Sequence, residues 1–124
     1  MIKYCTVTSF DREYKKMAKK YPSLPQDLET LKRAVIELYH LQGVNSGAAV
    51  PIEGLCSVEK AYLSMKVRKI ACRSLKGRGK NTGLRLIYVY KSEGQQVTFL
   101  EIYCKADKAN EDRARIKDFI KKLG

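Results

Sequence analysis

The fold of this chain is decided by the stretch Leu84-Arg85-Leu86-Ile87-Tyr88-Val89-Tyr90-Lys91, which is followed by Glu93-Gly94 and then by Val97–Cys104. Both long segments are rich in β-branched and aromatic residues, and the Glu-Gly pair between them is typical of a turn. The sequence therefore predicts a β-hairpin. Because side chains alternate along a strand, Arg85 is expected on the same face as Ile87 and Val89.

The segments around this hairpin predict an α+β domain. Ile2–Thr8 and Tyr62–Ser74 are strand-like, whereas Gly43–Gly54 is small, polar and typical of a loop. Apolar residues at helical spacing predict one helix before Pro22, a second directly after it and a third at the C-terminus. The expected order is β-α-α-β-β-β-α, with a small antiparallel sheet of about four strands packed against an N-terminal helical hairpin and a C-terminal helix.

Helix-end signals accompany the three predicted helices. Ser9 is the expected N-cap of the first, the pattern Ser23-x-x-Gln26 predicts a capping box for the second, and Asn110 is the expected N-cap of the third. His40 falls at the end of the second helix, where a positive charge interacts favourably with the helix dipole. We therefore expect a structural charge there rather than a catalyst.

Length and composition indicate one domain, residues 1–124, in a reducing compartment. No apolar run approaches the ~20 residues of a membrane span, and the N-terminus lacks the pattern of a secretion signal. The four cysteines are scattered and only one histidine accompanies them, so no zinc site is expected and a cytoplasmic location is favoured.

A basic segment occupies the centre of the chain. Lys60–Lys91 holds ten Lys and Arg residues and no Asp or Glu, within a chain of net charge +12. Its densest part is Lys76-Gly77-Arg78-Gly79-Lys80. Because such a segment repels itself, it indicates a polyanionic partner, above all nucleic acid. An anionic membrane surface, an acidic protein and a merely solvated basic surface are the alternatives.

The residues of this segment limit the chemistry that is open to the chain. The chain has no G-x-S-x-G, H-E-x-x-H or P-loop motif. The basic segment has no carboxylate that could hold catalytic metals. Lys, Arg and Tyr can still support RNA cleavage, in which the 2′-hydroxyl attacks the phosphate and fixed cations stabilise the developing charge. No metal or organic cofactor is implied. Arg85 could instead pair with Glu101 across the hairpin, and the tyrosines could be core residues.

Four motifs together resemble a known family. They are Arg68-Lys69-Ile70, Lys76-Gly77-Arg78-Gly79-Lys80, Gly83-Leu84-Arg85-Leu86-Ile87-Tyr88 and Ile102-Tyr103-Cys104-Lys105. In order and spacing they are similar to toxins of the RelE/ParE superfamily, and most to its HigB-like branch. The resemblance implies a small RelE-like α+β domain that enters the ribosomal A site and cuts mRNA there, and that a cognate antitoxin neutralises.

The resemblance also implies roles for individual residues. Arg85 matches the arginine that contacts the scissile phosphate, Lys105 the basic residue after the last strand, and Lys69 a lysine of the preceding strand. Arg73 would replace a second basic residue of that strand, where this chain has Ala71. Residues expected to face RNA are Arg68, Lys76, Arg78, Lys80 and Lys108.

The sequence departs from the family pattern at three places. The first is Ala71, and the second is the turn Lys80-Asn81-Thr82-Gly83, which is less basic and has one glycine fewer than the pattern. The third is the C-terminal segment Asn110–Gly124, which has no tyrosine where some members carry one. The expected function is a ribosome-dependent mRNA endonuclease whose partners are mRNA, the ribosome and an antitoxin, without a membrane. The alternatives are a ParE-like gyrase poison and a non-catalytic RNA-binding or partner-binding domain on the same fold.

Overall fold

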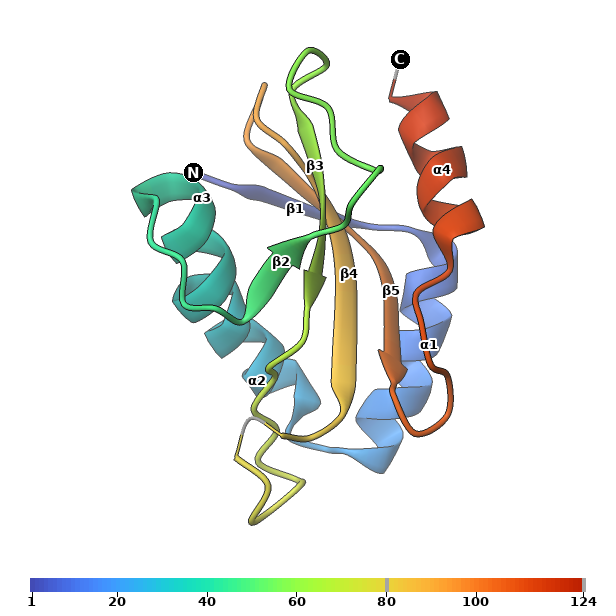
Figure 1. Cartoon of the computed structure of the whole chain (residues 1–124). Helices are drawn as coiled ribbons and strands as arrows, with labels where there is room; N and C mark the ends of the chain where they lie inside the picture. Colours follow the sequence, from blue (N-terminus) through green and yellow to red (C-terminus); the bar gives the residue numbers. More distant parts are fainter. Residues whose placement is uncertain (80, 124) are drawn as a thin grey trace.

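The computed structural model describes residues 1–79 and 81–123, which form a mixed sheet with helices on both faces (Figure 1). The elements are β1 (Lys3–Thr6), α1 (Thr8–Lys20), α2 (Leu24–Leu31), the π-helix η1 (Lys32–Glu37), α3 (Leu38–Gln42), β2 (Ala49–Pro51), β3 (Tyr62–Val67), β4 (Leu84–Lys91), β5 (Gln96–Cys104) and α4 (Arg113–Lys122). The strands lie in the order β1-β5-β4-β3-β2.

The α+β class is confirmed, but the expected sheet of about four antiparallel strands is wrong. The described residues form five strands, and β1 pairs with β5 in parallel while the other neighbours are antiparallel. The additional strand, β2, lies in the segment Gly43–Gly54 that was expected to be a loop. It has three residues and ends in Pro51, which an edge strand tolerates because one side of it needs no ladder hydrogen bond.

The sheet separates two apolar clusters. On one face, the first three helical elements α1, α2 and η1 contribute Phe10, Leu24 and Ile36, which pack with Tyr88 and Phe99 of the hairpin. On the other face, Ile116 of α4 packs with a second set of buried residues, namely Ile52, Leu55, Ile87, Val89, Leu100 and Tyr103. The central strands β4 and β5 are therefore buried on both faces.

The helix ends differ from the expected caps. Helix α1 begins at Thr8 after Val7, so Ser9 lies inside its first turn, and Ser23 donates its hydroxyl to Asp27 Oδ2 (2.6 Å) rather than capping α2. Helix α4 is capped by Asp112, whose carboxylate accepts from Arg115 N, and not by Asn110. In the described residues, no helix is long and apolar enough to cross a membrane.

His40 is not the exposed charge that its position in the sequence indicated. It lies in α3, its ring stacks on Tyr90 with centroids 4.0 Å apart, and its Nε2 shares a 2.8 Å hydrogen bond with the hydroxyl of Tyr88. Burial lowers the pKa of His40 from 6.5 to about 4. The imidazole is therefore neutral near pH 7, and the expectation of a charge that interacts with the helix dipole is wrong.

Candidate functional site

The pairing of β4 with β5 brings Arg85 directly opposite Tyr103. Strand alternation places Arg85 on the face of Ile87, which is the face that α4 covers. A bulge interrupts the ladder, because Ile87 pairs with Glu101 whereas the next residue, Tyr88, pairs with Phe99. Such a bulge turns two neighbouring residues towards one face, and it is the reason why simple alternation does not describe β5.

The guanidinium of Arg85 is held by backbone carbonyls. Its Nη1 donates to the carbonyl of Arg68 (3.0 Å) and to that of Leu84 (3.1 Å). Arginine has five N–H donors, so these two bonds fix the position of the group and leave donors without a protein partner among the residues described. Arg85 is only partly buried, and these donors are suited to an oxyanion such as a phosphate.

Tyr103 is a buried neighbour of this arginine. Its side chain is 6% exposed, and its hydroxyl has no hydrogen-bond partner in residues 1–79 and 81–123. Burial raises the pKa of Tyr103 to about 12, aided by the charges of Glu111 and Glu101 and opposed by that of Arg85. The phenol is therefore neutral near pH 7 and keeps its proton for donation.

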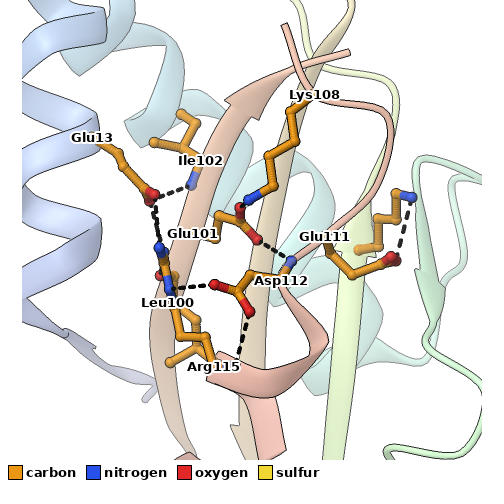
Figure 2. A network of polar contacts seen from close by, with 9 residues as sticks. Glu13, Leu100, Glu101, Ile102, Lys108, Glu111, Asp112 and Arg115 are labelled. Carbon is orange, nitrogen blue, oxygen red and sulfur yellow. Dashed lines mark hydrogen bonds and ion pairs between the residues drawn. The ribbon is translucent and has the colours of Figure 1, made fainter.

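The carboxylate of Glu101 is the most buried charge of this region, with 1% exposure. Figure 2 shows that it accepts one bond from Lys108 Nζ and another from the backbone N–H of Asp112 (2.8 Å). Lys108 Nζ also lies 5.4 Å from the centre of the Tyr103 ring. Because Glu101 binds Lys108, the alternative of a cross-strand ion pair between Arg85 and Glu101 is wrong.

A second ion pair covers the edge of β5 next to the residues that pair with β1, where β1 has ended. Glu13 of α1 binds Arg115 of α4 through both carboxylate oxygens (2.9 and 3.0 Å), as Figure 2 shows. The same two side chains satisfy the strand, since Glu13 accepts from Ile102 N (3.3 Å) and Arg115 donates to the carbonyl of Leu100 (2.8 Å). These side chains stand where a neighbouring strand would otherwise pair.

Lys105 lies at the same end of the hairpin as Arg85. It follows β5 directly, its side chain is exposed, and its backbone N–H donates to the carbonyl of Gly83 (2.7 Å), just before β4. Lys66 of β3 adds a further cation on the α4 side, where it pairs with Glu111 (3.4 Å). Three strands therefore bring cationic side chains towards the end of the sheet where β4 starts.

A basic turn, whose described residues are 76–79 and 81–83, extends from this end of the sheet. Lys76 and Arg78 are exposed, and the end of the turn is fixed where Thr82 Oγ1 donates to the carbonyl of Ile70 (2.7 Å). Arg68, whose carbonyl holds Arg85, is exposed directly after β3. Lys80, also expected to face RNA, lies outside the described residues.

Lys69 and Arg73 lie on a different side from Arg85. Both line a cavity of about 210 Å³ whose other walls come from α2, η1 and the segment before β2. The structure thus brings Arg85 and Lys105 to one end of the hairpin, and it directs two of the four expected catalytic residues towards the helices instead.

Sequence reasoning missed three members of this region, Lys66, Glu101 and Tyr103. Lys66 had a usable signal, because a lysine between Met65 and Val67 in a strand interrupts an apolar run. Tyr103 lies within the motif Ile102-Tyr103-Cys104-Lys105, and Glu101 was considered only as a partner of Arg85. Their orientation depends on the bulge, which appears only in the paired strands.

Metal ligands do not gather in the described part of the chain, where no group of three His, Cys, Asp or Glu side chains could hold an ion. Comparisons with protein-family models, curated proteins and solved structures give no match to this chain.

Proposed function

We propose that this protein is a metal-independent endoribonuclease that cuts mRNA on the ribosome, as the toxin of a toxin–antitoxin pair with a RelE-like fold. The observation that carries the proposal is the guanidinium of Arg85, fixed by two backbone carbonyls next to a basic turn and an exposed lysine, Lys105. Its action on ribosomes implies a cytoplasmic location.

The reaction needs fixed cations at the phosphate, which this end of the sheet supplies, and solvent water. The 2′-hydroxyl of RNA attacks the adjacent phosphorus and gives its proton to water. The bond to the 5′-oxygen breaks and that oxygen takes a proton from water, which leaves a 2′,3′-cyclic phosphate and a 5′-hydroxyl. In the transition state, negative charge gathers on the phosphate oxygens and the leaving oxygen. Arg85 stabilises the charge on the phosphate, and Lys105 stabilises the charge on the leaving oxygen.

Tyr103 takes a positioning role in this proposal. Tyr103 pairs with Arg85 across the hairpin, and its neutral hydroxyl, which has no partner among the described residues, would donate to the RNA. Lys69 and Arg73, which line the cavity beside α2, are assigned to RNA contact rather than to the reaction. Ribosomal RNA would contact the basic turn through Lys76 and Arg78.

The test is primer extension on a defined mRNA in a reconstituted translation system, with purified protein and with or without ribosomes. We expect cuts within the A-site codon that require ribosomes. Arg85→Ala should reduce the cleavage rate by about 100-fold or more, which corresponds to the loss of one fixed donor to the transition state. Arg85→Lys should recover part of the rate because it restores the charge without the fork of donors.

Lys121→Ala serves as the matched control, because it removes one exposed cation from α4 near the opposite end of β4, where it lines a cavity with Lys91. It should cleave like the unmodified protein. Intact mRNA with normal translation would refute the proposal and leave a gyrase poison or a binding domain, which a DNA-supercoiling assay then separates. Equal cleavage by Arg85→Ala would remove Arg85 from the mechanism.

A further inference from the structure

Helix α1 carries a second group of cations that the proposed reaction does not use. Its C-terminal half reads Tyr14-Lys15-Lys16-Met17-Ala18-Lys19-Lys20, with four exposed lysines and no acidic residue. Glu13, one turn before Lys16, is already bound to Arg115 and Ile102. None of the ion pairs found within the described residues involves these four lysines.

Helix stability accounts for only part of this pattern. Lys19 and Lys20 lie in the last turn, where each interacts favourably with the helix dipole by about 0.3–1 kcal/mol. Lys15 and Lys16 lie too far from the end for that effect, and each repels the lysine four residues later by about 0.2–0.5 kcal/mol. The pair Lys16 and Lys20 therefore gains little for the helix.

Lys16 and Lys20 border a groove of about 330 Å³ between α1 and the free edge of β5. The groove has an apolar and aromatic lining from Met17, Tyr21 and Ile102. Lys20 Nζ lies 5.4 Å from the centre of the Tyr21 ring. On the β5 side the groove is lined by Tyr103 and Lys108, so it is continuous with the candidate active site.

The acidic groups of the groove are mostly neutralised. Glu101 binds Lys108 and the N–H of Asp112, and Glu13 binds Arg115. Among the described residues that line the groove, Asp107 is the acid without an ion-pair partner. The two lysines of α1 then give the groove a positive border. A positive border with apolar and aromatic walls is the combination that binds single-stranded nucleic acid, whose backbone is anionic and whose bases stack.

We propose that this groove binds the single-stranded RNA next to the scissile phosphate, with Lys16 and Lys20 on its backbone and Tyr21 against a base. The inference rests on the proposed function in one respect, namely that the bound RNA continues towards Arg85. Its RNA contacts are independent of cleavage. A stretch of mRNA would then lie along the β5 edge, in addition to the ribosomal RNA held by the basic turn.

The experiment measures binding of a fluorescein-labelled 15-nucleotide oligouridylate by fluorescence anisotropy from 50 to 300 mM KCl. Each backbone contact contributes about 0.7 to the slope of log K against log salt for single strands. The double variant Lys16→Ala/Lys20→Ala should therefore lower the magnitude of the slope by about 1.4. At 100 mM KCl its affinity should be roughly 10- to 30-fold weaker. Tyr21→Leu should weaken binding at every salt concentration without changing the slope.

The matched control is Lys121→Ala/Lys122→Ala, which removes the same charge from exposed positions of α4. It should keep the slope of the unmodified protein. Both double variants should remain folded at 25 °C, because each loses only about 0.3–1 kcal/mol of helix-dipole interaction for every lysine in a last turn, and the higher helix propensity of alanine offsets part of that loss.

Equal loss in both double variants would overturn the inference, since total charge and not the groove would then decide binding. An unchanged slope for Lys16→Ala/Lys20→Ala, together with lost binding of poly-glutamate, would overturn it in favour of an acidic protein partner. Because binding is measured without ribosomes, the inference survives if A-site cleavage is not found. It fails separately if cleavage is found and the slope does not change.

Discussion

The imidazole of His40 is enclosed by aromatic side chains. It stacks on Tyr90, meets Tyr39 edge-on with centroids 4.8 Å apart, and shares a hydrogen bond with Tyr88. Burial also raises the pKa of Tyr88, so the phenol keeps its proton. A neutral ring joins α3 to the sheet at this point, and protonation of that ring disfavours the folded state.

This environment makes the folded state sensitive to mild acid. The pKa of His40 is about 4 in the folded chain and 6.5 in the unfolded chain, so the unfolded chain binds the proton first as the pH falls. Stability is greatest above pH 6.5 and falls between pH 6.5 and 4. Between pH 7 and 5.5 we expect the free energy of unfolding to fall by at most about 1 kcal/mol, since partial exposure of the ring allows solvent screening.

Urea denaturation at pH 7 and 5.5 measures this change. His40 is the only histidine of the chain, so His40→Gln should remove the dependence in that range. The variant also shows whether burial of the ring is the cause. If the unmodified protein and His40→Gln lost the same stability between the two pH values, another group would be responsible.

The other residue-scale observation concerns the buried carboxylate of Glu101. Its two oxygens are bound by different donors, Lys108 Nζ and Asp112 N, which is what a buried charge needs. Asp112 in turn caps α4. Glu101 of β5 therefore connects the start of α4 to Lys108, which lies above the Tyr103 ring.

At the scale of elements, the basic turn depends on a polar cluster at the start of α2. Ser23 accepts hydrogen bonds from Ser74 N and Ser74 Oγ (both 2.8 Å) and donates to Asp27. Asp27 is 7% exposed and also accepts from Arg73 N (3.2 Å). These bonds join α2 to the segment that leads into the basic turn, and they hold its cations close to the sheet.

Removal of the Ser23 hydroxyl should loosen this segment. Ser23→Ala leaves Ser74 N without the hydroxyl that it binds and Asp27 with Arg73 N as its remaining donor, so we expect the free energy of unfolding to fall by about 1–3 kcal/mol. Under native conditions trypsin should cleave faster after Lys76 and Arg78, because local opening frees the backbone around them to enter the protease. RNA affinity should fall although the charge is unchanged.

Limited proteolysis, urea denaturation and oligouridylate binding measure these effects. Ser9→Ala is the control, since within the described residues the hydroxyl of Ser9 makes no hydrogen bond and its removal should change none of the three. Unchanged trypsin cleavage in Ser23→Ala would show that the turn is held by Thr82 and the strands alone.

At the scale of the whole molecule, the net charge is +12, and several of the cations lie at one end of the sheet. Cations from α1, the basic turn, β4 and the segment after β5 lie towards the end of the sheet where Leu84 and Cys104 pair. A field of this kind steers an anionic partner towards one end and raises the association rate at low salt. The antitoxin of the proposed function would be an acidic segment that folds on this end.

The prediction at this scale concerns association kinetics with the protein that a neighbouring gene encodes. We expect the association rate constant, measured by stopped-flow fluorescence, to fall by about tenfold or more between 50 and 500 mM KCl, because the Debye length shortens from about 14 to about 4 Å. The dissociation rate should change less. A rate that does not depend on salt, or an absence of binding, would contradict the antitoxin hypothesis.

Local patterns predicted much of the architecture. The hairpin of β4 and β5, the helices on either side of Pro22 and the C-terminal helix follow from alternation, apolar spacing and turn residues, all of which act between near neighbours in the chain. Strand β2 and the parallel pairing of β1 were not predictable in this way. A three-residue strand has too few residues for a pattern, and the direction in which β1 pairs with β5 depends on the path of all the elements between them.

The sequence by itself determined the α+β class, the position of the basic turn and the choice of Arg85 and Lys105 as candidate site residues. Only the tertiary structure decided which cations share a face. Lys69 and Arg73 point towards α2 and η1, the bulge in β5 turns Glu101 to the α4 face, and α1 brings Lys16 and Lys20 beside Tyr103. The physical reason is that charge is fixed by composition, whereas its partners and its distance from other charges depend on long-range packing.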